Sequence, residues 1–133
     1  MADSGLMKIL YVDDETINLD LFQMIYKDTN NVLLAENGQD GLKIVKQNAD
    51  VQLIISDMHM PDMDGIYFIE KVKETNQNIP CFILSGYQRN ERIIDALNSG
   101  LISYYLMKPF GKKNLEMIIE KIIHSNNQNT QKN

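Results

Sequence analysis

Short apolar runs alternate along this chain with segments in which apolar residues recur every three or four positions. The runs predict five β-strands, at Lys8–Val12, Asn31–Ala35, Val51–Ser56, Pro80–Leu84 and Ser103–Met107. The first, third and fourth runs are apolar nearly throughout. That pattern is typical of strands that are buried on both faces of a parallel sheet.

The segments between and after these runs have the periodicity of amphipathic helices. The residues expected to face a core are Ile17, Leu21, Met24 and Ile25 in the first helix, Leu42 and Val45 in the second, Ile66, Ile69 and Val72 in the third, Ile93, Ile94 and Leu97 in the fourth, and Leu115, Ile118, Ile119 and Ile122 in the fifth. The fourth helix is expected to stop at Gly100, because glycine is the usual residue just past a helix end.

Strands that alternate with helices predict an α/β fold, with right-handed crossovers that place helices on both faces of the sheet. We expect a flavodoxin-like, doubly wound, five-stranded parallel sheet with strand order 2-1-3-4-5. In that order the topological switch point lies between the first and third strands, where ligands of such sheets bind.

The length of 133 residues suits one domain, and the net charge of -5 argues against a nucleic-acid surface. One cysteine, Cys81, excludes a disulfide framework, and the N-terminus lacks the features of a signal peptide. No apolar stretch approaches the ~20 residues that span a bilayer. We therefore expect a cytoplasmic domain at 1–124, without membrane or nucleic-acid partners, and a disordered polar tail or truncated linker at 125–133.

Charged residues follow three of the predicted strands. Asp13 and Asp14 come after the first strand, Asp57 after the third and Lys108 after the fifth. Because the carboxyl ends of parallel strands lie at one edge of a sheet, we expect these side chains to meet. Converging acids repel one another unless a cation is present, and Mg²⁺ prefers such oxygen ligands. These residue types suit a magnesium ion and a phosphoryl group.

Two simpler interpretations exist for these acids. Asp13-Asp14-Glu15 would suit the start of a helix, where acidic side chains cap the backbone and favour the dipole. The segment from Asp57 to Gly65 is rich in residues that form turns. Helix capping does not account for Asp57, and a turn can coexist with a site.

Four motifs carry a resemblance to a known family. They are the acid pair after the first strand, Asp57-Met-His-Met-Pro-Asp-Met-Asp-Gly65, Leu84-Ser85-Gly86-Tyr87, and Lys108-Pro109-Phe110. In their order and spacing, over about residues 7 to 123, the chain resembles the receiver domains of two-component response regulators. The resemblance implies a signalling switch and not an enzyme, with only self-phosphorylation and self-dephosphorylation chemistry.

The resemblance also implies roles for individual residues. Asp57 would accept a phosphoryl group from a phosphohistidine of a sensor kinase or phosphotransfer protein. Magnesium would be held directly by Asp14, Asp57 and the backbone carbonyl of His59, and through water by Asp13. The side chain of Lys108 and the backbone amides of Met58 and Gly86 would contact the phosphoryl oxygens.

Ser85 and Tyr105 would then form the switch, with the hydroxyl of Ser85 turning toward the phosphoryl group and the ring of Tyr105 swinging inward. The chain is one residue longer between Gly100 and Lys108 than most receivers. This leaves open an exchange of the roles of Tyr105 and Tyr104, which a shifted bulge would produce. A cis peptide bond between Lys108 and Pro109 is also expected.

Two finer hypotheses follow. His59 and Tyr87 would set the lifetime of the phosphoryl group by orienting or blocking water, although an exposed loop histidine without a role is the simpler interpretation of His59. The face formed by the fourth helix, fifth strand and fifth helix, with Met117 and Ile123, would support a phosphorylation-dependent homodimer.

Three other classes of protein share parts of this pattern. An aspartate-nucleophile phosphatase needs Asp-x-Asp, but Glu15 stands two places after Asp13 and His59 two places after Asp57. A flavin carrier needs a phosphate loop after the first strand, where Asp13-Asp14-Glu15 would repel phosphate. A receiver-like scaffold that binds partners without phosphorylation is the remaining alternative.

Overall fold

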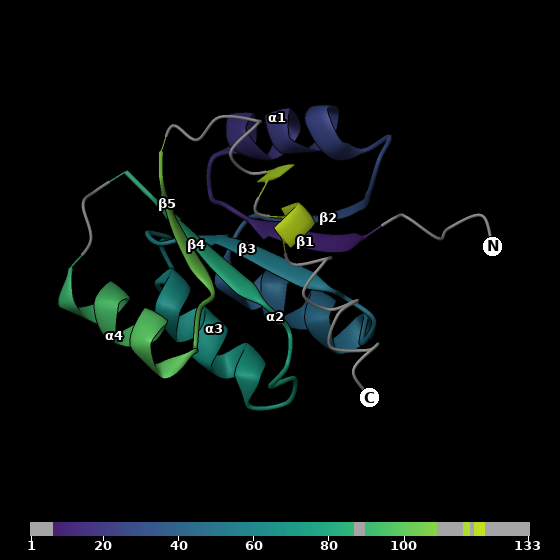
Figure 1. Ribbon diagram of the computed structural model, residues 1–133. Helices are drawn as coiled ribbons and strands as arrows, with labels where there is room; N and C mark the ends of the chain where they lie inside the picture. Colours follow the sequence, from purple (N-terminus) through teal and green to yellow (C-terminus); the bar gives the residue numbers. More distant parts are fainter. Residues whose placement is uncertain (1–6, 87–89, 109–115, 118, 122–133) are drawn as a thin grey trace.

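Five parallel strands form a single sheet in the order β2-β1-β3-β4-β5 (Figure 1). The computed structural model describes residues 7–86, 90–108, 116–117 and 119–121. The strands are β1 (Lys8–Val12), β2 (Asn31–Ala35), β3 (Leu53–Asp57), β4 (Cys81–Ser85) and β5 (Tyr104–Met107). The predicted strand order and the flavodoxin-like α/β class are confirmed. The bounds of β1 and β2 are as predicted, whereas the other three strands begin one or two residues later.

Helices cover both faces of the sheet, with α1 on one side and α2, α3 and α4 on the other (Figure 1). Their bounds are α1 Thr16–Tyr26, α2 Gly38–Gln47, α3 Gly65–Lys73 and α4 Glu91–Ser99, and residues 116–117 and 119–121 are also helical. No helix in these described ranges is both long and apolar enough to span a membrane. The predicted end of α4 is confirmed, since Gly100 caps it in a left-handed conformation with φ of 82°.

Alternating strand residues feed two separate cores, as the pleat of a buried sheet requires. Leu10 and Val12 of β1 pack in the core under α2, α3 and α4. Ile9 and Tyr11 of the same strand pack in the core under α1, which also contains Ile119. Strands β3 and β4 are buried along their whole length, as predicted for central strands.

The buried face of α1 differs from the prediction. Its buried side chains are Leu19, Phe22 and Tyr26, whereas Ile17, Leu21 and Met24 are 78%, 51% and 66% exposed. This helix is apolar on two sides. The aromatic side is the buried one, where the ring of Phe22 stacks on Tyr11 at a centroid distance of 4.4 Å and packs at a tilt against Tyr26 at 4.7 Å. We call the exposed residues Ile17, Leu21 and Met24 the α1 stripe.

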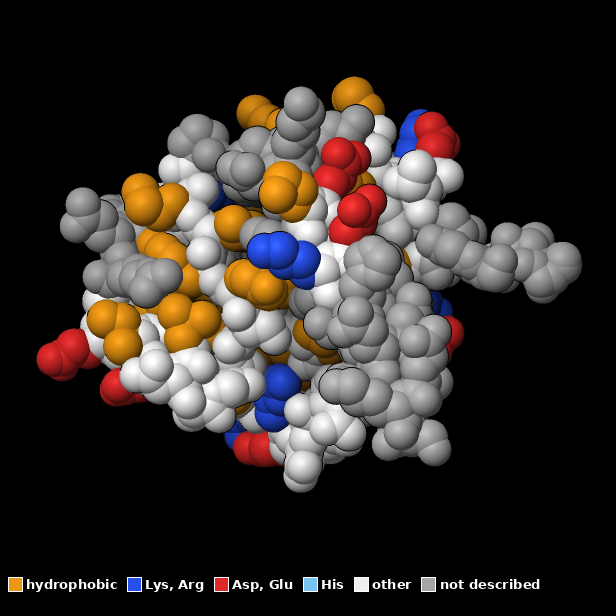
Figure 2. All heavy atoms as spheres, in the orientation of Figure 1, with side chains coloured by type: hydrophobic (Ala, Val, Ile, Leu, Met, Phe, Trp, Pro, Cys, Tyr) orange, Lys and Arg blue, Asp and Glu red, His pale blue; other side chains and the backbone are white. Residues whose placement is uncertain are grey.

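A second group of apolar side chains is exposed near α4 and β5, where Figure 2 shows hydrophobic side chains gathered. Ile94, predicted to face the core, is 42% exposed, and Met107 at the end of β5 is 50% exposed. Ile93 and Ala96 are the buried residues of α4.

Two aspartates hold the second half of the loop after β3, in keeping with its turn-rich sequence. Asp64 caps α3 by accepting from the amide of Tyr67 at 2.8 Å, and Asp62 accepts from the amides of Gly38 and Gln39 at the start of α2. A Cβ on Gly65 would collide with the backbone carbonyl of Asp57. The start of α3 therefore packs directly against the backbone of the last β3 residue.

Several predicted features lie outside the described residues. These are Tyr87, Pro109 with its expected cis bond, Leu115, Ile118, Ile122 and Ile123 of the fifth helix, and the polar tail at 125–133.

Candidate functional site

Three acids meet at the carboxyl edge of the sheet, as predicted. Asp57 is the last residue of β3, and Asp13 and Asp14 follow β1, its neighbour in the sheet. Asp13 and Asp57 are 0% and 5% exposed, whereas Asp14 is exposed. One oxygen from each carboxylate lies within 4.8 Å of the others. Oxygen ligands at this separation fit a hard divalent cation such as Mg²⁺.

Helix capping does not explain the acids after β1. The N-cap residue of α1 is Glu15, and its side chain makes no capping hydrogen bond. Asp13 instead accepts from the amide of Glu15 through Oδ1 at 3.0 Å, which fixes the turn between β1 and α1. Each acid of the pair also has an oxygen within 4.8 Å of an oxygen of Asp57, which helix capping does not explain.

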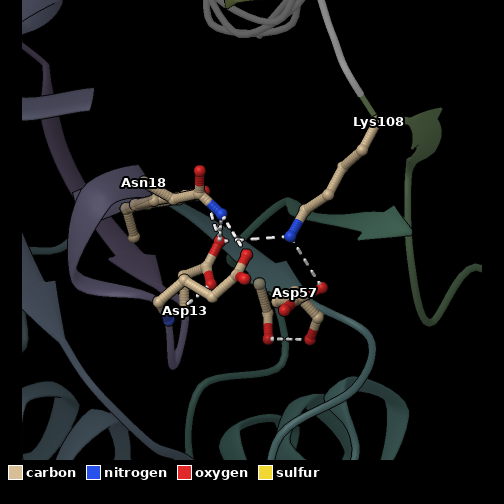
Figure 3. Close-up of polar contacts among 7 residues, drawn as sticks. Asp13, Asn18, Asp57 and Lys108 are labelled. Atoms are coloured by element: carbon tan, nitrogen blue, oxygen red, sulfur yellow. Dashed lines mark hydrogen bonds and ion pairs between the residues drawn. The ribbon is translucent and has the colours of Figure 1, made fainter. Parts of the chain in front are cut away.

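Lys108 reaches this acidic cluster from the end of β5 (Figure 3). Its Nζ lies 3.2 Å from Asp57 Oδ1 and 3.3 Å from Asp13 Oδ2, so one ammonium group is shared by two buried carboxylates. The backbone amide of Lys108 donates to the carbonyl of Ser85 at 2.7 Å, which ties the lysine to the end of β4. The predicted meeting of Asp13, Asp57 and Lys108 is confirmed.

The electrostatics of the cluster follow from its burial. Burial raises the pKa of Asp57, and the negative charge of Asp13 raises it further against the opposing effect of Lys108. Burial alone would lower the pKa of Lys108, but the charges of Asp13 and Asp57 raise it overall, so Lys108 is a cation. Three acids facing one ammonium leave an excess of negative charge that a divalent cation would neutralise.

Two residues that the sequence analysis did not identify also hold Asp13. Tyr11 donates its hydroxyl to Asp13 Oδ2 at 2.7 Å, and the side-chain amide of Asn18 donates to the same oxygen at 3.1 Å. Burial and the neighbouring Asp13 raise the pKa of Tyr11 far above its ordinary value, so the phenol is protonated and donates. The alternation of side chains along β1 could have indicated Tyr11, because Tyr11 and Asp13 are two residues apart and therefore lie on the same face of the strand.

The remaining predicted site residues lie around the cluster. Ser85, the last residue of β4, is 1% exposed, while Gly86 and His59 are exposed. The amide of Met58 donates to the carbonyl of Leu84 at 2.8 Å, so the sheet already uses this donor. The predicted contact of Met58 with a phosphoryl oxygen would require this bond to be shared or exchanged.

The register of β5 bears on the two adjacent tyrosines. Pairing with β4 runs without interruption from Tyr104 to Met107, so no bulge occurs there. Tyr105 pairs with Ile83 and is half-buried against the core under α4, whereas Tyr104 packs edge-on against Phe82 on the α1 side. Since Ile83 and Ser85 share a face of β4, Tyr105 and not Tyr104 lies on the same side of the sheet as Ser85.

Comparisons with known proteins agree with this geometry. The family model described as response regulator receiver domain matches residues 9–120. The chain is 32% identical to the chemotaxis protein CheY1 of Helicobacter pylori strain J99, with 90% of this chain and 99% of that protein covered. A response regulator receiver domain protein from Clostridium thermocellum superposes with a TM-score of 0.85 at 30% identity, covering 92% of this chain and 98% of that one.

The chain is also 33% identical, over 86% of its length, to the transcriptional regulatory protein ZraR of Escherichia coli strain K12. It spans about a quarter of that larger regulator, 26% of its length. Receiver domains generally bind Mg²⁺ at an acidic pocket and interact with histidine kinases or phosphotransfer proteins. The fold, the acidic edge and the matched family together show that the chain belongs to the response regulator receiver domains, the phosphorylation-activated signalling switches of two-component systems.

Proposed function

We propose that Asp57 is the phosphoacceptor of this switch. A carboxylate oxygen of Asp57 would attack the phosphorus of a phosphohistidine on a sensor kinase or phosphotransfer protein. The new O–P bond would form as the N–P bond breaks, and the released imidazole would take up a proton. The observation that supports this proposal is the position of Asp57, at the end of a fully buried central strand, with Lys108 3.2 Å away.

Magnesium would be held by Asp14, Asp57 and the backbone carbonyl of His59, and through water by Asp13. The ion would supply positive charge between the anionic nucleophile and the anionic donor, which otherwise repel each other. Lys108, the amides of Gly86 and Met58, and the hydroxyl of Ser85 would contact the phosphoryl oxygens. Small-molecule phosphoryl donors would modify Asp57 without a kinase, and water would later release the group.

The switch would connect Ser85 to Tyr105. Both residues lie on the α4 side of the sheet, and the backbone bond from Lys108 to Ser85 links the two strand ends. When Ser85 turns toward a phosphoryl oxygen, space would open along β5 into which Tyr105 could move. A phosphoryl group adds a charge of about -1.5 to -2 at the site. That charge is enough to shift the equilibrium between the two arrangements of Ser85 and Tyr105.

The exposed apolar side chains on α4 and β5 are the proposed surface for dimerisation of the phosphorylated form. Ile94 and Met107 are exposed there, and Met117 of the following helical residues is 59% exposed. We expect sedimentation to show dimers with beryllofluoride and monomers without it. Monomers in both states would rule this surface out. The net negative charge of the chain does not favour binding to nucleic acid. We propose that the protein acts in the cytoplasm, where ATP is available to sensor kinases.

The α1 stripe is the proposed docking surface for the protein that donates the phosphoryl group. That protein must reach Asp57 from the carboxyl edge of the sheet, and the first turn of α1 borders this edge, since Asn18 contacts Asp13. Ile17, Leu21 and Met24 are apolar and exposed beside it. An apolar patch next to a charged site suits a partner that presents its histidine on an amphipathic helix.

The alternatives are not favoured. A buried pair of acids that share one lysine lowers the stability of the fold. A scaffold that acts without phosphorylation would have no use for such a cluster. The phosphatase alternative lacks its Asp-x-Asp motif, and Glu15 is exposed and bonded to Asn18.

Incubation with acetyl phosphate and Mg²⁺ tests the phosphoacceptor. We expect intact-mass spectrometry to show one added phosphoryl group on the wild type and none on Asp57→Asn, because the amide is not a nucleophile. The decay of the same signal gives the acyl-phosphate half-life, which should change in His59→Ala and Tyr87→Ala if these residues control water. An unmodified wild type would contradict the proposed function, and unchanged half-lives would remove only the lifetime hypothesis.

The excess of negative charge at the three acids predicts an effect on stability, which is measured in buffer free of divalent cations. Asp57→Asn should raise the free energy of unfolding by about 1 kcal/mol at neutral pH, because one buried charge beside Asp13 is removed. Since the folded-state pKa of Asp57 is raised, its ionised form opposes folding above that pKa, and the advantage of asparagine should shrink as pH falls through it. Chemical denaturation at several pH values measures this.

Asp20→Asn, which removes an exposed acid of α1, is the matched control and should change stability little. Saturating Mg²⁺ should stabilise the wild type more than Asp57→Asn. An asparagine variant that is less stable than the wild type would show that Lys108 fully compensates the cluster.

Docking on the α1 stripe is tested by comparing two donors. Leu21→Asp should slow phosphotransfer from an autophosphorylated sensor kinase about tenfold, the effect of losing one interface anchor, and leave the rate with acetyl phosphate unchanged. Ile94→Asp changes a similarly exposed residue on α4 and should leave both rates intact. Equal kinase rates for Leu21→Asp and the wild type would exclude this surface.

A further inference from the structure

Tyr11 is a buried residue of β1 whose hydroxyl reaches the acidic site from within the core. Its side chain is 1% exposed, and its ring stacks on Phe22 of α1. Its hydroxyl donates to Asp13 Oδ2 at 2.7 Å, a shorter bond than those from Asn18 at 3.1 Å and Lys108 at 3.3 Å to the same oxygen. Tyr11 is therefore the closest of these three partners of Asp13.

The donors on Asp13 Oδ2 differ in charge. The hydroxyl of Tyr11 and the amide of Asn18 are neutral, whereas Lys108 is a cation that Asp13 shares with Asp57. A buried carboxylate oxygen needs donors to offset its lost hydration. Neutral donors meet this need without placing positive charge near the position where the three acids would hold a divalent cation.

We propose that Tyr11 is a positioning residue for cation binding, whose hydroxyl fixes Asp13 and leaves Lys108 available to Asp57. The proposal rests on the proposed function in one respect: it requires a divalent cation at the acidic edge. It adds that the affinity for this cation is set partly by a phenol behind the acids and not by the acids alone.

Loss of the hydroxyl should change how Lys108 is shared. Without Tyr11 as a donor, Oδ2 would keep only Asn18 and Lys108 of these three donors, so the ammonium would be drawn toward Asp13. Its positive charge beside Asp13, and the loss of the bond that fixes this carboxylate, would then oppose cation binding. Neither effect requires a change in the fold.

Tyr11→Phe is the appropriate variant, because it removes one oxygen atom and keeps the stacked ring. Mn²⁺ is used as the probe, and the free ion is quantified by its EPR signal as protein is added. We expect the dissociation constant to rise about tenfold, which is the lower end of the range for partners that orient metal ligands.

Phosphorylation by acetyl phosphate gives a second readout. The Mg²⁺ concentration for half-maximal rate should rise in Tyr11→Phe, while the rate at saturating Mg²⁺ stays near that of the wild type. A merely structural role would lower stability and leave both cation constants unchanged.

Tyr26→Phe is the matched control. Tyr26 is also a buried phenol that packs against Phe22, with its ring tilted, but it is the last residue of α1 and lies at the end away from the acids. Its variant should bind Mn²⁺ like the wild type. Asn18→Ala removes the other neutral donor from a partly exposed position, so it provides an answer even if Tyr11→Phe does not fold.

The outcomes separate this proposal from the one it rests on. Weaker Mn²⁺ binding in Tyr11→Phe and Asn18→Ala, but not in Tyr26→Phe, supports the role of Tyr11. Unchanged binding in Tyr11→Phe, or in Asn18→Ala where the first variant is unfolded, overturns it and leaves the proposed function standing. A wild type that binds no Mn²⁺ overturns the cation site and the positioning role together.

Discussion

Two buried carboxylates share one ammonium group at the edge of the sheet, and residues of β1, α1 and the end of β5 hold them there. Asp13 and Asp57 are almost fully buried, Asp14 lies beside them, and Lys108 bridges the two buried acids. Such a cluster is unfavourable in water-excluded surroundings unless further donors or a cation complete it. The same imbalance makes the edge receptive to a divalent cation. A strongly bound anion would need that cation, because the lysine alone cannot offset the acids.

The backbone of Asp57 and the loop that follows it are held by contacts with the neighbouring helices. The start of α3 at Gly65 leaves no room for a side chain against Asp57, and Asp62 joins the loop after β3 to the start of α2. Asp64 both caps α3 and pairs with Arg92 of α4 at 2.6 Å. The loop after β3 is thus tied to three helices, so that chemistry at Asp57 acts on a fixed point.

The sequence predicted the sheet and the meeting of Asp13, Asp57 and Lys108, because strand periodicity and parallel topology leave few places for residues at strand ends. It failed at α1, where apolar residues occupy two sides and only the aromatic stack on Tyr11 decides which is buried. It also missed Tyr11 and Asn18 as partners of Asp13. A tyrosine in an apolar run is indistinguishable from a core residue until the direction of its hydroxyl is known, and Asn18 reaches Asp13 only because of the turn between β1 and α1.

The arrangement also bears on the proposed switch between Ser85 and Tyr105. Ser85 and Tyr105 share one side of the sheet, and the side chain of Tyr105 packs in the core under α4. Neighbouring strands hold a continuous register, so a shift at the end of β4 must be absorbed by side chains and not by sliding of β5. Packed cores favour discrete side-chain rearrangements over gradual deformation. Ile94 of α4 and Met107 of β5 are exposed apolar residues of the elements that flank Tyr105, so the proposed switch would act on their surface.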